Sequence, residues 1–419
     1  MKRTVNEWLE YLESLHPSEI ELGLERIKGV GERLDCLKPA PLVILVAGTN
    51  GKGTTSALVA NLLMAQGMKV GVYSSPHIQR YNERVQINGE LISDDDLVRS
   101  FETVESVRAD IGLTYFEFGT LAALSYFQQS GLDACVLEIG LGGRLDAVNI
   151  VDADISLVTS VGLDHQAWLG DTVERIAFEK CGVARSGKYL VCGQPNPPHT
   201  AKEQTESLGG QWCARGQHFD IVEEGDELLL SFMTHEGQAE WNLPKANIPY
   251  HNVGTAIQAL SLIGRLPNRA VVADVVKNTS VAGRLQTLTV PVDGGELTLT
   301  LDVAHNQQAA AYIAERLGSV DGAIIGMLED KPVEALINTL PKMPDCWLAG
   351  LDCWRGLSAD QLAERVATAN DCLVTEKFAT VADAIAQLLR KESVAGQHWL
   401  IAGSFHTVEA ALNYLQQRD

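Results

Sequence analysis

Basic side chains and long apolar segments are both scarce in this chain of 419 residues. Lysine and arginine number 33 against 54 acidic residues, which gives a formal net charge of −21, and no run of five basic residues occurs. Nucleic acids and anionic membranes attract basic surfaces, so we expect neither as a partner. No apolar stretch reaches membrane-spanning length, and the N-terminal residues MKRTVNEWLEYL lack a signal-peptide core, so we expect a cytoplasmic protein.

Cysteine pairs of the kind that bind zinc are also missing. The eight cysteines form no C-x-x-C pair, and several lie in apolar runs such as DACVLEI and YLVCG. We therefore expect reduced thiols in the core rather than a zinc site or a disulfide framework.

The pattern along the chain indicates an α/β protein. Its length favours two domains, and apolar runs alternate with helical patterns from residue 42 onward, which is typical of a parallel sheet covered on both faces. Expected strands are 42–47, 69–73, 133–139 and 155–161, and expected helices are 4–15, 54–65 and 252–266. A small β insertion is expected at 219–243, and a second strand series follows in LTLTLDVAH, AIIGML, CWLAGL and HWLIAGS. We predict an N-terminal P-loop-type domain at 1–281, a linker at 282–287 and a smaller C-terminal α/β domain at 288–419.

The stretch LVILVAGTNGKGTT, residues 42–55, runs from an apolar strand through a glycine-rich turn into a helix. The N–H groups of such a turn, the helix N-terminus and Lys52 could bind phosphate together. The usual G-x-x-x-x-G-K-[ST] pattern is broken, because Val46 replaces the first glycine and Gly53 replaces the hydroxyl residue that holds Mg²⁺. The metal then needs oxygen ligands from elsewhere. The alternative is a tight turn with a surface lysine.

Two polar residues that follow other expected strands could supply these ligands. Ser75 comes after the strand at 69–73, although Ser-Pro-His is also a common turn sequence. Glu138 lies near the end of the strand at 133–139, at the edge where open α/β sheets bind ligands. A carboxylate there is costly unless it is paired or metal-bound, which favours a functional role.

A histidine and a lysine are further candidates. His165 follows the strand at 155–161, and both a functional and a structural role are open. Lys180 lies on a helical stretch beside the apolar residues Ile176, Ala177 and Val183. Its ammonium group either reaches the surface along the apolar stem or is poorly solvated and tends to lose its proton.

Seven segments resemble, in order, the motifs of the folylpolyglutamate synthase family. They are GTNGKGT, SSPHIQRYNERV, LEIGLGGRLDAVNIVD, TSVGLDH, FEKCGV, LDVAHN and GSFHTV. The resemblance covers nearly the whole chain and points to the bifunctional bacterial branch, which also synthesises dihydrofolate.

The resemblance implies an ATP-dependent amide ligase of the superfamily that includes the muramyl-peptide ligases. The N-terminal domain would bind ATP and the pterin, and the C-terminal domain would be a Rossmann-like glutamate ligase domain. In this family the donor carboxylate becomes an acyl phosphate, from which the amine of L-glutamate displaces phosphate. The implied partners are ATP, L-glutamate, dihydropteroate and reduced folates, with two Mg²⁺ ions, and the family is commonly monomeric.

The resemblance also assigns residues to roles. One Mg²⁺ would be held by Ser75 and Glu138, and the second by His165 near a carbamylated Lys180; a carbamate suits a hard cation that an ammonium would repel. The implied catalytic residues are Lys52, Glu138, His165 and Lys180. The implied ATP contacts are Thr49, Asn50, Gly51, Lys52, Asn252, Arg284 and Asp302. The implied pterin contacts are Ser14, Leu15, His16, Pro17, Thr114, Tyr115, Phe116, Glu117, Leu145, Asp146 and Ala147.

The two donors differ by one glutamate, so their reacting carboxyl groups lie several ångströms apart. We therefore expect two overlapping ways of seating the pterin, with 114–117 and 145–147 serving dihydropteroate. Tyr115 and Phe116 could stack on a planar ring, although aromatic residues at such spacing are often simply core.

Three alternatives stay open. One is a folylpolyglutamate synthase without the dihydrofolate activity. Another is a muramyl-peptide-type ligase, which is disfavoured by SSPH and by the missing hydroxyl after Lys52. The last is a P-loop kinase or nucleotide switch, which would not need the second domain with LDVAHN.

Overall fold

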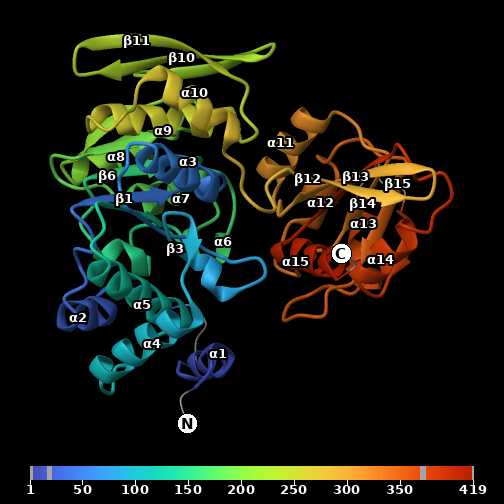
Figure 1. Ribbon diagram of the computed structural model, residues 1–419, viewed down its shortest axis with the longest axis horizontal. Coiled ribbons are helices and arrows are strands. Elements are labelled where there is room, and N and C mark those ends of the chain that lie inside the picture. Colours follow the sequence, from blue (N-terminus) through green and yellow to red (C-terminus); the bar gives the residue numbers. More distant parts are fainter. Residues whose placement is uncertain (1–2, 17–20, 369–373, 418–419) are drawn as a thin grey trace. The chain divides into compact units, whose positions relative to one another are not determined.

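The computed structural model describes residues 3–16, 21–368 and 374–417 (Figure 1). The chain forms two compact units, Met1–Thr279 and Ser280–Asp419. No helix in the described ranges is both long and apolar enough to cross a bilayer. None of the seven cysteines in the described ranges forms a disulfide, and six of them are buried, as expected for core thiols.

An eight-stranded sheet organises the first unit. Its order is β4-β3-β2-β5-β1-β6-β7-β8, and all neighbours run parallel except β2 with β3 and β3 with β4. The bounds are β1 (Leu42–Ala47), β2 (Val70–Tyr73), β3 (Val85–Ile87), β4 (Glu90–Leu91), β5 (Ala134–Glu138), β6 (Ile155–Val158), β7 (Tyr189–Cys192) and β8 (Gln211–Ala214). The predicted parallel sheet is thereby confirmed, with β1 at the predicted residues.

Hydrophobic cores cover both faces of this sheet, because alternate residues of β1 point to opposite sides. Val43 and Leu45 join the core with α1, α2, α4, α5 and α7, while Ile44 and Val46 join the core with α3, α9 and α10. The helices are α1 (Val5–Ser14), α2 (Glu25–Arg33), α3 (Lys52–Met64), α4 (Asp94–Arg108), α5 (Tyr115–Gln129), α6 (Gln166–Leu169), α7 (Val173–Cys181), α8 (His199–Ser207), α9 (Tyr250–Leu262) and α10 (Arg269–Asn278), with the 3-10 turns η1 (Tyr81–Arg84) and η2 (Ala147–Ile150).

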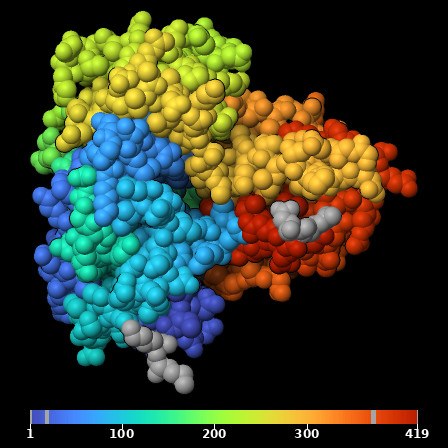
Figure 2. Space-filling model, viewed as in Figure 1, coloured from blue at the N-terminus to red at the C-terminus, as the bar shows by residue number. Residues whose placement is uncertain are grey.

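The predicted β insertion is an antiparallel three-stranded sheet. It consists of β9 (Asp220–Glu224), β10 (Glu227–Thr234) and β11 (Gly237–Pro244), with β10 in the middle. One face packs on α9 and α10, and Figures 1 and 2 show this layer in yellow-green at the top of the first unit. The insertion thus thickens the core on the α3 side of the large sheet.

Some element ends differ from the sequence-based expectation. Helix α9 ends at Leu262 rather than 266, because Gly264 adopts a positive φ of 64° that stops a helix. Strand β6 ends at Val158 rather than 161, since Thr159 and Ser160 turn away to hold a neighbouring loop. Helix α1 has the predicted capping box of Thr4 and Glu7.

The second unit contains a six-stranded sheet of order β12-β13-β17-β14-β15-β16, parallel except for the β12–β13 hairpin. Strand β12 begins at Gln286, inside the stretch 282–287 that was expected to be a linker. The strands are β12 (Gln286–Val292), β13 (Gly295–Asp302), β14 (Gly322–Ile325), β15 (Asp345–Ala349), β16 (Val374–Phe378) and β17 (His398–Ala402). The helices are α11 (Gln307–Leu317), α12 (Val333–Ile337), α13 (Ala359–Val366), α14 (Val381–Leu388) and α15 (Phe405–Gln416).

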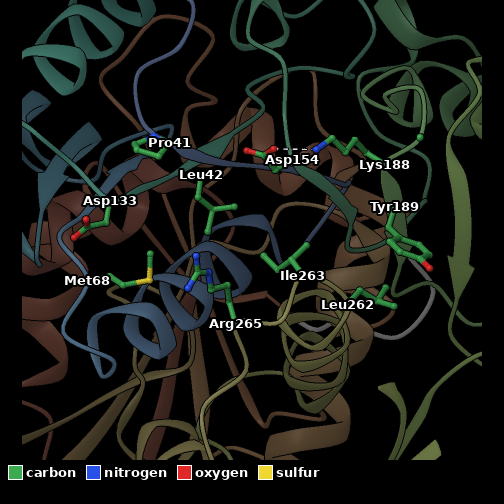
Figure 3. Close-up of a pocket in the computed structure, with 11 residues that line it drawn as sticks. Pro41, Leu42, Met68, Asp133, Asp154, Lys188, Tyr189, Leu262, Ile263 and Arg265 are labelled. Carbon is green, nitrogen blue, oxygen red and sulfur yellow. Dashed lines mark hydrogen bonds and ion pairs between the residues drawn. The ribbon is translucent and has the colours of Figure 1, made fainter. Parts of the chain in front are cut away.

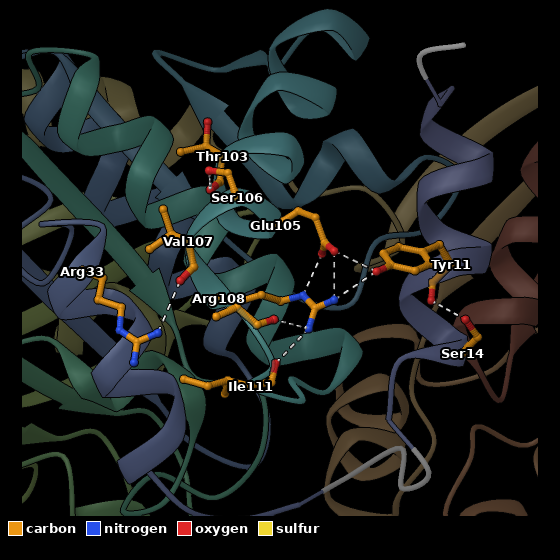
Figure 4. Close-up of polar contacts among 10 residues, drawn as sticks. Tyr11, Ser14, Arg33, Thr103, Glu105, Ser106, Val107, Arg108 and Ile111 are labelled. Carbon is orange, nitrogen blue, oxygen red and sulfur yellow. Dashed lines mark hydrogen bonds and ion pairs between the residues drawn. The ribbon is translucent and has the colours of Figure 1, made fainter.

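A polar cluster joins α1 to α4 (Figure 4). The Tyr11 hydroxyl donates to Glu105 Oε1 (2.9 Å), and Arg108 donates to both Glu105 Oε2 (2.7 Å) and Tyr11 Oη (3.0 Å). Burial alone would raise the pKa of Glu105, but the hydrogen bonds from Arg108 and Tyr11 lower it overall. The ionised carboxylate therefore stabilises the docking of α1.

Replacing the central cation should loosen α1. We expect Arg108→Ala to weaken the docking by about 1.5 kcal/mol, because a charged hydrogen-bond partner is lost. Amide exchange across residues 5–14 would then be about tenfold faster. The difference in exchange rate should shrink as the pH falls through the lowered pKa of Glu105, because the protonated carboxyl no longer forms an ion pair with Arg108. Arg99→Ala is the control, since Arg99 is 65% exposed and pairs with Asp96 on the same helix; equal exchange in the two variants would contradict this role.

Candidate active site

In the first unit, the residues predicted to bind phosphate and metal lie at one edge of the large sheet. Strand β5 pairs with β1 through Val46 and Glu138 and with β2 through Tyr73 and Leu137. The glycine-rich loop, Ser75 and Glu138 therefore all lie at the carboxyl ends of neighbouring strands. Strand β6, on the other side of β1, leads toward His165 at the same edge. This edge is where open α/β sheets bind ligands.

The glycine-rich loop makes a close turn against the end of β6. Gly51 adopts a left-handed φ of 85° just before α3, which begins at Lys52. A Cβ on Gly48 would lie 1.9 Å from Thr159 Oγ1, so only glycine fits there. The Thr159 hydroxyl donates to the Asn50 carbonyl oxygen (2.6 Å). The loop is therefore held by its neighbour as well as by its own sequence.

Further contacts fix the N–H groups of the loop. Thr49 N donates to Ser160 O, and Asn50 N donates to Ser160 Oγ, both at 2.9 Å. The Lys52 ammonium lies near the loop carbonyl oxygens, 3.1 Å from Gly48 O. The first turn of α3 then presents its own N–H groups at the helix N-terminus, a favourable place for phosphate oxygens.

The hydroxyl of Thr54 is occupied within the fold. It donates to Gly51 O (3.0 Å) and accepts from Asn252 Nδ2 (2.6 Å). Asn252 is 1% exposed, and its Oδ1 has no hydrogen-bond partner among the described residues although it lies beside the Gly51 turn. Thr54 thus cannot replace the missing loop hydroxyl in this arrangement, and Asn252 adds an open acceptor at the turn.

Glu138 stands beside the position from which the usual loop hydroxyl would project. Its side chain is 4% exposed, and a Cβ on Gly53 would lie 3.8 Å from Glu138 Oε2. Ser75 is half-buried, two residues beyond the end of β2. The fold thus brings a buried carboxylate to the first turn of α3 and a hydroxyl residue to the adjacent strand end. Both are oxygen donors that suit Mg²⁺.

Lys180 is buried on α7. It is only 4% exposed, so the alternative in which its ammonium reaches the surface is wrong. Burial lowers the pKa of Lys180 to about 7; the charge of Lys52 acts in the same direction, and the carboxylates of Asp164 and Asp146 oppose it. Near neutral pH a large fraction of this amine is uncharged, the form that reacts with CO₂.

His165 lies at the surface end of the same edge. It has a positive φ of 50°, precedes α6, and its side chain is 41% exposed. Its N–H donates to Asp164 Oδ1 (2.9 Å), and that oxygen is 3.9 Å from His165 Nε2. Within the described ranges, no group of three or more His, Cys, Asp or Glu side chains that could hold a metal is found. The predicted donor set instead mixes Ser75, one carboxylate, one histidine and a modified lysine.

The loop after β5 carries Leu145, Asp146 and Ala147. Asp146 is buried and accepts from Leu141 N (2.7 Å) and Val148 N (2.9 Å), which shapes the entry to η2. Burial raises the pKa of Asp146 to about 6, although backbone N–H groups and the charge of Lys52 oppose the shift. The charge of Lys52 thus acts on both Asp146 and Lys180.

The segment at the start of α5 has a structural role of its own. Thr114 and Glu117 form its capping box, and Glu117 also pairs with Arg26 at 3.0 Å. The half-buried Phe116 packs on the loop after β5, where a Cβ on Gly140 would lie 2.5 Å from its ring, and Tyr115 contacts Tyr81 edge to face. Of this segment, the two aromatic rings are the groups left for a planar ligand.

The remaining predicted residues fall in two places. Ser14 ends α1 and donates to Tyr11 O, Leu15 follows it, and His16 Nε2 lies 2.9 Å from Glu21 Oε2. Pro17 lies outside the described residues. In the second unit, Asp302 ends β13 and accepts from Leu285 N and Ala304 N, both at 2.8 Å, while the Arg284 guanidinium lies 5.0 Å from the Phe405 ring. Their assignment to ATP stays a prediction.

A separate hollow of about 390 Å³ lies at the opposite edge of the large sheet (Figure 3). One part of its lining lies at or before the amino ends of strands and includes Leu42, Asp154 and Lys188, of which the last two form an ion pair at 3.1 Å. The other part is the end of α9 and the residues after it, including Ile263 and Arg265. Arg265 projects between its apolar walls. This edge is distant in the topology from the glycine-rich loop, so the two are distinct features.

Sequence reasoning missed the residues that hold the glycine-rich loop. Thr159 and Ser160 stood within an expected strand, and only their hydroxyl groups in TSVGLDH could have marked them. Arg84 was also missed: it is 8% exposed, donates to His77 Nδ1 (2.8 Å) and lies 5.1 Å from the Tyr81 ring. Thr159, Ser160 and Arg84 make these contacts with residues that only folding brings close to them.

Comparison with known proteins agrees with this geometry. Residues 46–203 match the Mur ligase middle domain, and residues 283–405 match the Mur ligase glutamate ligase domain. The chain is 41% identical to the dihydrofolate synthase/folylpolyglutamate synthase of Escherichia coli, over 98% of this chain and 95% of that one.

Solved structures with the same fold cover nearly the entire chain. One is E. coli FolC in complex with DHPP and ADP, with a TM-score of 0.91, 39% identity, and coverage of 99% of this chain and 98% of the other. Another is a bifunctional folylpolyglutamate synthase/dihydrofolate synthase with Mn, AMPPNP and L-glutamate bound, with a TM-score of 0.88, 41% identity and the same coverage. The chain therefore belongs to the dihydrofolate synthase/folylpolyglutamate synthase family of ATP-dependent ligases.

Proposed function

We propose that this chain joins L-glutamate both to dihydropteroate, giving dihydrofolate, and to reduced folates, giving folylpolyglutamates, in a single active site. The observation that carries the proposal is the 41% identity to a bifunctional relative over nearly the whole chain. The assembly of Glu138, Lys180 and the glycine-rich loop at one sheet edge supports it, because it provides the charges that phosphoryl transfer needs. A monomer is the state we expect.

Phosphate binding is the task of the loop and the first turn of α3. Backbone N–H groups at the helix N-terminus would bind phosphate oxygens, and Lys52 would offset the charge of the outer phosphates. The open acceptor of Asn252 at the Gly51 turn fits a hydrogen-bond donor of a ligand or of bound water. Arg284 and Asp302 are the ATP contacts proposed for the second unit.

The donor set fits a divalent cation. A solved relative contains Mn with AMPPNP, and we propose two Mg²⁺ ions here. Ser75 and Glu138 would hold one, and His165 with a carbamylated Lys180 the other. When bound, these ions would stabilise the charge of the transferring phosphoryl group. The buried, partly neutral amine of Lys180 is what carbamate formation requires.

The ligation would proceed through an acyl phosphate. The donor carboxylate attacks the γ-phosphorus of ATP, and ADP leaves. The amino nitrogen of glutamate then attacks the acyl carbon, loses a proton, and phosphate departs as the amide bond forms. The protein contributes by holding the two reactants in line and by placing cationic and N–H groups around the phosphates.

The alternative functions would use other substrates than a folate glutamate ligase does. A kinase or nucleotide switch would consume ATP without an amino-acid acceptor, and a muramyl-peptide-type ligase would prefer a nucleotide-linked sugar. The match of both Mur ligase models together with curated relatives named for folate substrates favours the folate ligase.

Removing the buried carboxylate should abolish ligation. We expect Glu138→Ala to lower kcat by about 100-fold or more, because a hard anionic ligand and its charge compensation are lost. Glu224→Ala is the control, since Glu224 is an exposed carboxylate at the end of β9. Circular dichroism should show both variants folded. Near-normal turnover in Glu138→Ala would remove this residue from the metal site.

The modification of Lys180 can be detected directly. We expect about 44 Da of extra mass on the peptide that contains Lys180, as one added CO₂ requires, or a ¹³C signal after exposure to ¹³CO₂. At a fixed concentration of dissolved CO₂ the occupancy should rise as the pH passes upward through about 7, because the neutral amine becomes the major form. Lys188→Ala is the control, and Lys180→Ala should lose both signal and activity. An unmodified Lys180 in active, magnesium-bound protein would refute the carbamate.

The bifunctional assignment is tested by measuring both ligations in one preparation. Wild-type protein with ATP, Mg²⁺ and L-glutamate should use dihydropteroate and tetrahydrofolate. Phe116→Ala should lower kcat/KM for dihydropteroate about tenfold more than for tetrahydrofolate, because its ring packs beside the loop that carries Asp146. Wild-type protein unable to use dihydropteroate would reduce the assignment to a folylpolyglutamate synthase, and equal losses in Phe116→Ala would argue against separate seating of the donors.

A further inference from the structure

The hollow of about 390 Å³ at the opposite edge of the large sheet combines apolar walls with charged groups (Figure 3). Its walls include Leu42, Met68 and Ile263, half-buried side chains that extend the core on the α3 side of the sheet. The volume falls within the range of about 300–1,000 Å³ that is typical of small-molecule sites, which are mostly apolar with a few polar groups. We call the hollow bounded by these residues, Lys188 and Arg265 the amino-end hollow.

Most charged groups in this lining already have partners. Asp154 pairs with Lys188 at 3.1 Å, and the Asp133 carboxylate accepts from Lys69 N at 2.7 Å. The Arg265 guanidinium is different, because within the described ranges it makes no hydrogen bond or ion pair. Arg265 is exposed, so an incoming ligand can reach it. An accessible guanidinium without a protein partner suits an anionic group of a ligand.

These features together favour a ligand that has an apolar ring and one carboxylate. Figure 3 shows the Arg265 side chain among Leu42, Met68 and Ile263, so one ligand could contact the apolar walls and the cation together. A planar guanidinium can donate two parallel hydrogen bonds to a carboxylate. The net charge of −21 repels anions at longer range, so the affinity must come from this local cation and from the apolar contact.

Two elements that form the glycine-rich loop have their far ends at the amino-end hollow. Strand β1 begins at Leu42, in the lining, and ends at Ala47, directly before the loop. Helix α3 begins at Lys52, in the loop, and ends at Met64, four residues before Met68 of the lining. The hollow and the loop are therefore joined by a buried strand and by a helix that packs on it.

Helix α9 provides a third connection. Asn252, in its first turn, donates to Thr54 Oγ1 of α3 (2.6 Å), and its last residue, Leu262, lines the amino-end hollow. The helix spans about 20 Å between its two ends. Beyond them, Gln66 Nε2 donates to Arg265 O (2.8 Å), which joins the segment after α3 to the segment after α9. Helices α3 and α9 are thus held together at the loop and again at the hollow.

We propose that the amino-end hollow binds a small monocarboxylate with an aromatic or alicyclic ring, and that its occupancy strengthens nucleotide binding at the glycine-rich loop. A ligand among Leu42, Met68 and Ile263 contacts the far ends of β1, α3 and α9 together and restricts their motion. Phosphate binding orders the near ends of the same elements, so the second ligand to bind has less ordering left to do. The coupling rests on the proposed phosphate binding by the loop, whereas the site itself does not.

Binding is tested with 2-naphthoate, whose bicyclic ring and single carboxylate match the hollow. In protein labelled with ¹³C-methyl methionine, the Met68 signal should shift with a Kd of about 1 mM, as a small and partly enclosed ligand allows. The signal of Met327, which is buried in the second unit, should not move. Neutral 2-naphthylmethanol and cationic 2-naphthylmethylammonium should bind about tenfold more weakly, because neither pairs with Arg265. An unmoved Met68 signal, or equal binding of the three probes, would overturn the site.

A charge-removing variant locates the carboxylate. Arg265→Gln should weaken 2-naphthoate binding about tenfold and leave 2-naphthylmethanol binding unchanged, because one charged hydrogen-bond partner is lost while the backbone contact with Gln66 is kept. Arg99→Gln is the matched control, since Arg99 is 65% exposed on α4 and lies outside the lining. Phe116→Ala examines the other place where an aromatic carboxylate could bind, the proposed pterin site. A loss of affinity in Phe116→Ala but not in Arg265→Gln would overturn the proposal.

The coupling is measured by titrating ADP, with Mg²⁺, into protein with and without saturating 2-naphthoate. The Kd for ADP should fall about threefold, and the Kd for 2-naphthoate should fall by the same factor in saturating ADP, because coupling between two sites is reciprocal. Amide exchange across 52–64 should slow with 2-naphthoate alone. An ADP affinity that is unchanged or weaker would overturn the coupling. Protein that binds 2-naphthoate at Met68 but never binds ADP would instead refute the phosphate-binding role proposed for the loop.

Discussion

The hydroxyl of Thr159, at the end of β6, donates to the Asn50 carbonyl oxygen and fills the space in front of Gly48. With Ser160 it holds the glycine-rich loop to the strand next to β1. Because the loop leads directly into α3, this contact also sets where the helix N-terminus points. Glu138 and Asn252 lie against the first turn of that helix. Their placement relative to the loop therefore depends on the contacts that hold the loop.

The second constraint is the burial of ionisable groups at the same edge. Glu138, Asp146 and Lys180 are each less than a tenth exposed, and burial shifts the pKa of the latter two toward neutrality. Such groups are costly in a fold and need partners. A metal ion, a phosphate or a carbamate bound at this edge would reduce the free-energy cost of burying these groups. The proposed metal, phosphate and carbamate would couple ligand binding to local stability at this edge.

Sequence patterns located secondary-structure elements best where a strand is buried on both faces. The strand LVILVA is buried on both faces and was located to the residue. QTLTVPV alternates half-buried and exposed residues, contains Pro291, and lies where the linker and domain boundary were expected. Glu138 could be placed because parallel strands end at a common edge. The loop contacts of Ser160 and the burial of Lys180 could not be placed, since both depend on which distant segments pack nearby.

The order of the central strands bears on how the chain is made. Strand β1 has β5 and β6 as its only neighbours in the described sheet, yet Ala134, the partner of Leu42, is synthesised about 90 residues later. At ribosomal rates of about 5–20 residues per second, the apolar segment LVILVA waits several seconds without its pairing partners. The nascent chain therefore exposes an apolar segment early, and a chaperone that holds unfolded chains would be expected to act before β5 is synthesised.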